Sequence, residues 1–273
     1  MPATEVLVDG LDHPEGVAWD PAIGVLWAGG EDGQLYRVDI ESRTWTEAPR
    51  APGFVLGLAV DGRGRLAICC SGAGAVCVLA DGAVSTLHDG FTLPNYAAFT
   101  ADGTLYFSDS GNWGAGDGRV FRLDADGELD LFSERLPNFP NGCAVTQDGR
   151  HLWIVESYVP TVNRFDLETG EVDEVTRLDG TVPDGIAFTD EGGVIVSCYR
   201  PDRIVHLDRN GDVEVLAEDP QGTLLAAPTN IVFVGENRDR LVSANLGRWH
   251  LTLLDVGLRG APLHYPLRWA ADA

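Results

Sequence analysis

The sequence predicts an all-β fold, a six-bladed β-propeller whose four-stranded antiparallel blades surround a central channel. The chain has 33 glycines among 273 residues, and Asp-Gly pairs recur between short apolar runs, which is typical of β-hairpins. One strand–turn–strand pattern occurs six times, at steps of 39 to 46 residues. No segment has the length and periodicity of a helix. We therefore expect residues 1–273 to form a single propeller domain.

Each repeat opens with a short strand, a polar turn and a strongly apolar second strand. These units are residues 13–30, 55–72, 93–111, 139–157, 182–199 and 227–245. A second hairpin follows each unit, and the series ends with HLTLLDVGLRGAPLHY at residues 250–265. Each repeat is thus expected to supply four strands, and a four-stranded repeat of about 40–45 residues is typical of a propeller blade.

One strand-like segment, TEVLVDG at residues 4–10, precedes the first repeat. An unpaired strand at the edge of a sheet is a site of unwanted association, so proteins usually cover or pair it. We expect this segment to pair with the last blade and to close the ring.

The first strand of each blade lines the central channel, so equivalent positions of the six repeats should meet around one axis. The residues at the equivalent position are Glu15, Leu56, Asn95, Asn141, Asp184 and Thr229. Asn and Asp before Gly are also common turn residues, which is the competing interpretation for Asn141 and Asp184. Their shared position in the repeat favours a functional ring instead.

Glu15 and Asp184 would repel each other across a narrow channel, and one of them would be forced to bind a proton. A divalent cation removes this cost. The ring offers oxygen atoms only, which suits Ca²⁺, Mg²⁺ or Mn²⁺. The six histidines are scattered along the sequence without a ligand pair, so a histidine-based zinc site is not expected. We predict one divalent cation, with Ca²⁺ preferred and Mg²⁺, Mn²⁺ or Zn²⁺ as alternatives.

The segments HPEGVAW, LPNYAAF, FPNGCAV and VPDGIAF resemble the blade-entry motifs of the senescence-marker-protein/gluconolactonase family, the regucalcin-like propellers. The resemblance extends over all six repeats. It implies one divalent metal, often calcium, held by Glu15, Asn141 and Asp184. It also implies that Asn95 contacts the substrate and that Asp184 is the general base. Typical members of that family hydrolyse lactones.

The sequence departs from that pattern in two places. Members that act on sugar lactones often have Arg two positions before the substrate Asn and Asp directly after it, whereas this chain has Leu93 and Tyr96. With Leu56 on the ring, these residues make the mouth less polar. A sugar lactone would leave hydroxyl groups unpaired in such a site. We therefore expect Asn95, Tyr96, Leu93 and Leu56 to bind a less polar lactone or ester.

The expected reaction is metal-dependent hydrolysis. The cation would polarise the carbonyl group and stabilise the oxyanion, and Asp184 would accept a proton from the attacking water. Two other functions fit the same ring, namely a non-catalytic calcium- or ligand-binding propeller and a related metal-dependent reaction. A serine nucleophile is not expected, since there is no GxSxG motif.

Other residues are weaker candidates. The second strands end at Asp109, Glu156, Ser197 and Asn245, which could reach the same rim, and Asp109 and Glu156 could equally be solvated turn residues. The glycine-rich segment 108–119 could form a flap that carries Trp113, although an ordinary loop is the simpler expectation. The cysteines on the inner strands are expected to be buried small apolar residues.

The composition limits the possible functions further. The chain has 42 acidic and 19 basic residues, with a net charge of −23, which argues against nucleic acid as a partner. All the basic residues are arginine, so Schiff-base and P-loop lysine chemistry are excluded. The sequence lacks a membrane-length apolar run and a signal-peptide pattern at its start. We expect a cytoplasmic protein with a small-molecule substrate and no membrane partner, and its oligomeric state stays open.

Overall fold

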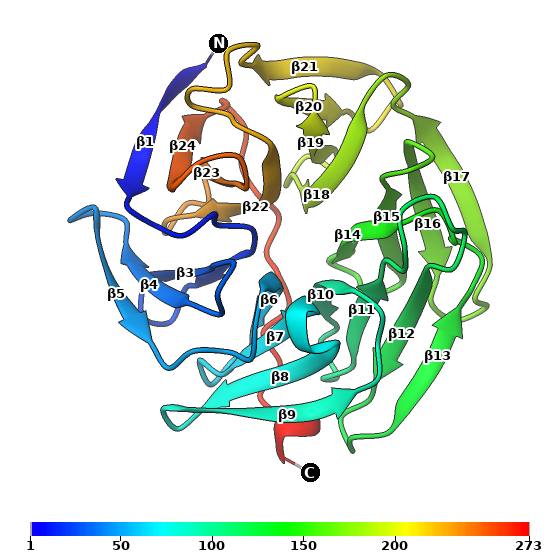
Figure 1. Cartoon of the computed structure of the whole chain (residues 1–273). Helices are drawn as coiled ribbons and strands as arrows, with labels where there is room; N and C mark the ends of the chain where they lie inside the picture. Colours follow the sequence, from blue (N-terminus) through cyan, green and yellow to red (C-terminus); the bar gives the residue numbers. More distant parts are fainter. Residues whose placement is uncertain (1, 273) are drawn as a thin grey trace.

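The computed structural model describes residues 2–272 and confirms the all-β, six-bladed β-propeller (Figure 1). Each blade is a sheet of four antiparallel strands. Blades 1 and 2 contain β2 (Val17–Asp20), β3 (Val25–Gly29), β4 (Leu35–Asp39), β5 (Thr44–Ala48), β6 (Val55–Val60), β7 (Leu66–Cys70), β8 (Ala75–Ala80) and β9 (Ala83–Asp89). Blades 3 and 4 contain β10 (Pro94–Phe99), β11 (Leu105–Asp109), β12 (Arg119–Leu123), β13 (Leu129–Ser133), β14 (Pro140–Val145), β15 (His151–Glu156), β16 (Thr161–Asp166) and β17 (Val172–Arg177). Blades 5 and 6 contain β18 (Val182–Phe188), β19 (Val194–Arg200), β20 (Arg203–Leu207), β21 (Val213–Glu218), β22 (Pro228–Val234), β23 (Arg240–Asn245) and β24 (His250–Asp255).

The N-terminal strand β1 (Ala3–Asp9) completes blade 6, as expected for the segment at residues 4–10. It pairs antiparallel with β24, from Ala3 opposite Asp255 to Asp9 opposite His250. The first and last strands of the described chain therefore share one sheet, which closes the ring (Figure 1).

The expectation of a complete hairpin over residues 250–265 is wrong. Only the first half forms a strand, β24, and the outer position of the sheet is occupied by β1. The rest of the segment leaves the blade. Pro262 within it and Pro266 directly after it cannot donate the backbone hydrogen bonds of a regular strand. The last repeat thus supplies three strands rather than four.

The hydrophobic core lies between neighbouring blades, where the faces of adjacent sheets pack together. One cluster joins Ala18 and Trp27 of blade 1 to Leu58 and Ile68 of blade 2. Strand residues alternate between such clusters, because side chains on a strand point to opposite faces in turn. This packing leaves the N-terminal ends of the six first strands around the channel.

A β-bulge marks the ring position in five of the six blades. The register shifts between residues 55 and 58, 94 and 97, 140 and 143, 183 and 186, and 228 and 231. Two residues of the first strand therefore face one residue of the second, and a bulge of this kind redirects the side chains at that point. The five bulges coincide with five of the six ring positions that the repeat predicts.

Glycine after the ring residue allows neighbouring first strands to approach closely. A Cβ atom at Gly142 would lie 2.2 Å from the Asp184 backbone oxygen, and one at Gly185 would lie 2.5 Å from the Thr229 backbone oxygen. Both distances are far below van der Waals contact, so a larger residue would push the blades apart. The two glycines keep the channel narrow beneath Asn141 and Asp184.

The C-terminal segment crosses the opposite end of the channel and runs through the middle of the view in Figure 1. Three hydrogen bonds to backbone oxygens hold it there. The Ala261 N–H donates to the Phe188 oxygen (2.9 Å), and the Tyr265 hydroxyl donates to the Trp19 oxygen (3.1 Å). The Gly62 N–H donates to the Pro266 oxygen (2.8 Å). The short 3₁₀ helix η2 (Ala270–Asp272) ends the described chain, and η1 (Ser71–Ala73) is the other such helix. Among residues 2–272 no helix is long and apolar enough to cross a membrane.

Trp269 anchors this segment. Its side chain is fully buried, its ring centre lies 5.0 Å from that of Phe99, and its indole Nε1–H donates to Asp61 Oδ2 at 2.8 Å. Replacing Trp269 by Ala should lower the free energy of unfolding by about 3–5 kcal/mol, and the Tm by about 10 °C for a chain of this size. Thermal unfolding followed by circular dichroism measures the change. Trp249→Ala, at a side chain that is 59% exposed, is the matched control, and an equal loss in both variants would contradict the anchoring role.

Candidate metal centre

Most of the predicted site residues meet in one cavity of about 400 Å³ at the N-terminal ends of the first strands. It is lined by Glu15, Phe54, Leu56, Ser71, Leu93, Asn95, Trp113, Phe139, Asn141, Ser157, Val182, Asp184, Tyr199, Arg200 and Leu246. Thr229 and Tyr96 are outside this lining. The remaining predicted ring and substrate residues, from five different blades, are brought together.

Four buried oxygen atoms in this lining have no hydrogen-bond partner. They are Glu15 Oε2, Asn95 Oδ1, Asn141 Oδ1 and Asp184 Oδ1. The exposed fraction of these four residues is between 2% and 6%. A buried oxygen without a partner typically costs about 1–3 kcal/mol. Four such atoms on residues around one cavity indicate a ligand that accepts lone pairs.

Serine hydroxyls orient the two ring amides. Asn95 Nδ2 donates to Ser110 Oγ (2.9 Å), and Asn141 Nδ2 donates to Ser157 Oγ (3.2 Å) and to Asp184 Oδ2 (3.1 Å). Because the amide nitrogens are engaged, the amide oxygens are left as the free atoms. The two serines in turn donate to the backbone oxygens of Pro140 and Pro183 in the next blade. The same hydroxyls therefore fix the amides and join the blades.

Thr229 supports the ring from outside the cavity lining. Its hydroxyl donates to the Glu15 backbone oxygen at 2.9 Å, and the Asn230 N–H donates to the same oxygen at 3.3 Å. These contacts connect blade 6 to the residue that precedes blade 1. They hold the backbone of Glu15, which lies just before β2, in place.

The two ring carboxyl groups influence each other. Burial raises the pKa of Glu15 well above its usual value, and the charge of Asp184 raises it further. Burial also raises the pKa of Asp184, to about 7, against the opposing effect of the hydrogen bond from Asn141. Both shifts have the sign expected for negative charge held away from water. A bound cation would reverse this cost.

The donor set fits a hard divalent cation. Glu15, Asn95, Asn141 and Asp184 each present an unpaired oxygen, and Ca²⁺, Mg²⁺ and Mn²⁺ prefer carboxylate and carbonyl oxygen ligands. Two carboxylates also balance the charge of a 2+ ion. No cysteine or histidine lines the cavity in the described residues, so nitrogen and sulfur ligands are not offered at this point.

The walls above the ring are largely apolar. Leu56 and Leu93 line the cavity as predicted, with Phe139 and Trp113 beside them. The Trp113 ring centre lies 5.0 Å from that of Phe139 and 5.3 Å from that of Tyr158. The loop that carries Trp113 is closed by hydrogen bonds from Asn112 N and Nδ2 to the two Asp117 carboxylate oxygens (2.7 and 2.8 Å). The segment 108–119 thus places an aromatic wall at the cavity.

Tyr96 lies elsewhere than the sequence predicts. It is 7% exposed, packs with Cys143 and Val145, and lines a smaller apolar cavity of about 90 Å³ on the other side of the ring. The bulge explains the difference, because it directs Asn95 and Tyr96 to different surroundings although they are consecutive. Tyr96 belongs to the inner part of the channel rather than to the larger cavity.

Asp109 and Glu156 shape the loops that lead into the ring. Asp109 Oδ1 accepts from the Leu93 N–H (2.6 Å), and Glu156 Oε1 accepts from the Asn138 N–H (2.6 Å). Asp109 also pairs with Arg119 at 2.7 Å, and burial raises the pKa of Glu156. Both are buried, so the solvated-turn interpretation is wrong for each. Asn245 Oδ1 accepts from the Ala226 N–H in the same way (2.9 Å).

Ser197 and the five cysteines lie outside the cavity lining and have structural roles. Ser197 Oγ accepts from the Gly185 N–H (2.8 Å) and donates to the Thr229 backbone oxygen. All five cysteines are free and buried, as predicted for those on the inner strands. Neither group lines the 400 Å³ cavity.

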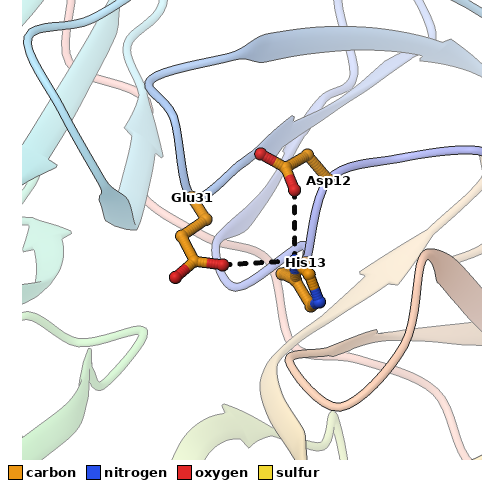
Figure 2. A group of neighbouring side chains, drawn as sticks. All are labelled: Asp12, His13 and Glu31. Atoms are coloured by element: carbon orange, nitrogen blue, oxygen red, sulfur yellow. Dashed lines mark hydrogen bonds and ion pairs between the residues drawn. The ribbon is translucent and has the colours of Figure 1, made fainter.

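A second group of polar side chains lies apart from this lining. His13 Nδ1 is 3.1 Å from Asp12 Oδ1 and 3.1 Å from Glu31 Oε2 (Figure 2). Sequence reasoning missed it, because Glu31 is far from the other two in the chain and outside the ring position. The three side chains are 34% to 57% exposed, and the ring nitrogen already has carboxylate partners. They form an ion-pair and hydrogen-bond group beside the entry to blade 1.

Fold and site together define a six-bladed β-propeller with an oxygen-rich ring at one mouth of its channel. The family model described as "SMP-30/Gluconolactonase/LRE-like region" matches residues 13–244. The chain belongs to this family, as the resemblance of the blade-entry motifs predicts. The match covers all six ring positions.

Solved structures with the same fold are distant in sequence. A gluconolactonase from Xanthomonas campestris is 22% identical, with coverage of 94% of this chain and 89% of that chain and a TM-score of 0.78. The calcium-binding protein regucalcin from Agrobacterium tumefaciens is 18% identical, with 97% of each chain covered and a TM-score of 0.81. A luciferin-regenerating enzyme is 17% identical, with 98% of this chain and 100% of that chain covered and a TM-score of 0.80. No curated protein matches the sequence significantly.

Proposed function

We propose that this protein is a divalent-cation-dependent hydrolase that acts on a small lactone or ester less polar than a sugar lactone. The observation that carries the proposal is the set of four unpaired buried oxygens around one cavity with apolar walls. Membership of the family and similarity to a gluconolactonase and to a calcium-binding propeller support it. Fold alone does not determine the reaction, so the chemistry of the site carries the argument.

Glu15, Asn141 and Asp184 are the residues that would hold the cation. Their donor atoms favour Ca²⁺, and Mg²⁺, Mn²⁺ and Zn²⁺ are the alternatives. A bound cation supplies Lewis-acid polarisation of a carbonyl group and lowers the pKa of water. The protein supplies a rigid arrangement for it, because Asn141 is held by Ser157 and Asp184 (3.2 and 3.1 Å).

Asp184 is the proposed proton acceptor. Its Oδ2 is held by the Asn141 amide at 3.1 Å, whereas its Oδ1 is unpaired. One oxygen is thus oriented by the protein and the other is available at the cavity. A carboxylate in this position can accept a proton from a water molecule that attacks the substrate carbonyl carbon.

Asn95 and the apolar walls would position the substrate. The Asn95 amide donates one N–H to Ser110 Oγ (2.9 Å), and its Oδ1 has no partner. It can therefore accept a hydrogen bond from a substrate as well as donate its second N–H. Leu56, Leu93 and Phe139 offer no hydrogen bonds from their side chains. A substrate with several hydroxyl groups would leave these groups unpaired against such walls.

Hydrolysis of a substrate panel with added calcium tests the proposal. Alkyl and aryl lactones and aryl acetates should give a kcat/KM about tenfold or more above that of gluconolactone, in line with the cost of an unpaired polar group. A clear preference for gluconolactone would contradict the proposed substrate polarity. Cation binding with no hydrolysis of any substrate would contradict the hydrolase and favour a non-catalytic binding propeller.

A further inference from the structure

Arg200 gives the mouth of the cavity a positive charge. It is the last residue of β19 and the only basic residue among the described residues that line the cavity. The other charged residues of the lining are Glu15 and Asp184 at the ring. A protein with a net charge of −23 repels anions in general. The single positive side chain of Arg200 at the mouth therefore strongly affects which ligands can enter.

The guanidinium group of Arg200 is held in place. Its Nη1 donates to Asp202 Oδ1 (2.6 Å) and to the Tyr199 backbone oxygen (2.8 Å), and its Cζ lies 4.8 Å from the centre of the Tyr199 ring. Asp202 is itself fixed, because its Oδ1 accepts from the Ala227 N–H at 2.6 Å. The loop after β19 is thereby connected to the loop before β22.

Only one nitrogen of this group is engaged within the described residues. The hydrogen bonds of Arg200 involve Nη1, whereas Arg carries five N–H donors in a planar fork. The side chain is 54% exposed, so Nε and Nη2 can reach a ligand without the loss of a protein contact. A planar fork beside an aromatic ring matches the geometry of a carboxylate.

We propose that Arg200 binds an anionic group of the substrate and makes the site selective for small aromatic lactones or esters that carry a carboxylate remote from the scissile bond. This inference rests on the proposed hydrolytic function. The cation at the ring neutralises Glu15 and Asp184, and the aromatic walls contact the apolar part of the substrate. Arg200 then recognises the carboxylate. An aromatic ester that carries a carboxylate fits all three regions, namely the cation site, the aromatic walls and Arg200. A neutral sugar lactone fits only the cation site.

The test compares matched neutral and anionic substrates in the calcium-loaded protein. The pair is phenyl acetate and 4-acetoxybenzoate, and the quantity is the ratio of their kcat/KM values. The wild type should favour the carboxylate about tenfold, as expected for one charge-assisted bidentate contact. Arg200→Gln should remove this preference mainly through KM, and Arg200→Lys should retain part of it. Arg209→Gln, an equal charge change at an exposed turn of the same blade, should leave the ratio unchanged.

A binding measurement separates this inference from the proposed function. The amides acetanilide and 4-acetamidobenzoate have the shapes of the two esters, and their Kd values can be measured by calorimetry even if no ester is hydrolysed. The wild type should bind 4-acetamidobenzoate about tenfold more tightly than acetanilide. Arg200→Gln should bind the two compounds with equal affinity. Equal ratios in the wild type and in Arg200→Gln would overturn the role of Arg200. A preference that persists in Arg200→Gln and disappears on chelation would assign carboxylate binding to the cation instead.

Discussion

Replacement of Asp184 by Asn is expected to lower kcat at least 100-fold while the fold is preserved. The substitution removes the proposed proton acceptor, whose contribution in enzymes is about 10²–10⁴-fold. It also removes one of the two negative charges around the cation site. The side chain keeps its shape, and its oxygen can still accept the hydrogen bond that Asn141 donates to Asp184 Oδ2. The loss should therefore be chemical rather than structural.

A parallel variant separates the two roles of Asp184. Glu15→Gln removes the other ring carboxylate but leaves the proton acceptor, so saturating calcium should restore much more turnover to it than to Asp184→Asn. Asp212→Asn, at an exposed position of the same blade, should match the wild type. Calorimetric calcium titration and hydrolysis rates measure these effects. If Asp184→Asn binds calcium and retains most of its turnover, Asp184 is not the base.

Calcium is expected to raise the thermal stability of the protein, and more so at alkaline pH. Burial raises the pKa of Asp184 to about 7 and that of Glu15 above its usual value. The folded state without a cation therefore binds more protons than the unfolded state, and its free energy of unfolding falls as the pH rises from about 4 through 7. A cation binds the ionised carboxylates and removes this penalty. At 100 times its Kd it contributes about 2.7 kcal/mol, or about 5–8 °C in Tm.

Thermal unfolding at pH 6 and pH 8.5, with chelator or with calcium, measures this dependence. This range avoids surface carboxylates such as Asp272, whose pKa is lowered to about 2 by the hydrogen bond from Arg65. In the double variant Glu15→Gln/Asp184→Asn the calcium shift should vanish. Without calcium at pH 8.5, this variant should be more stable than the wild type, since it buries no charge. An equal calcium shift in both proteins would place the stabilising cation elsewhere.

The repeat predicts most of the fold and the centre of the site, because a propeller places equivalent positions around one axis. Glu15, Asn95, Asn141 and Asp184 are far apart in the chain yet line one cavity. Their equivalent positions in the repeats are enough to identify them from the sequence. The pairing of residues 4–10 with the last blade followed from the same logic, since a closed ring leaves no sheet edge exposed.

Features outside the repeat were harder to predict. The C-terminal segment has no periodic pattern, and its position depends on single contacts such as that between Trp269 and Asp61. Tyr96 follows a ring residue directly, but the bulge in β10 places it beyond the ring. Neither feature leaves a signal in composition or spacing.

The sequence also does not indicate which residues outside the ring position lie near the site. Arg200 reaches the cavity from the C-terminal end of β19, and His13 meets Glu31 across two loops of blade 1. Only the three-dimensional arrangement shows which of the 19 arginines lies at the mouth. Specificity is therefore less predictable from this sequence than the ring itself.

The most direct test of the central claim is the cation content of the purified protein together with lactone and aryl ester hydrolysis before and after chelation. We predict about one tightly bound divalent cation per chain, held through oxygen ligands. Hydrolysis should be lost on chelation and restored by calcium, and the Glu15→Gln/Asp184→Asn variant should show neither the cation nor the activity. A wild-type protein that binds no divalent cation, or that hydrolyses its substrates equally well after chelation, would contradict the account.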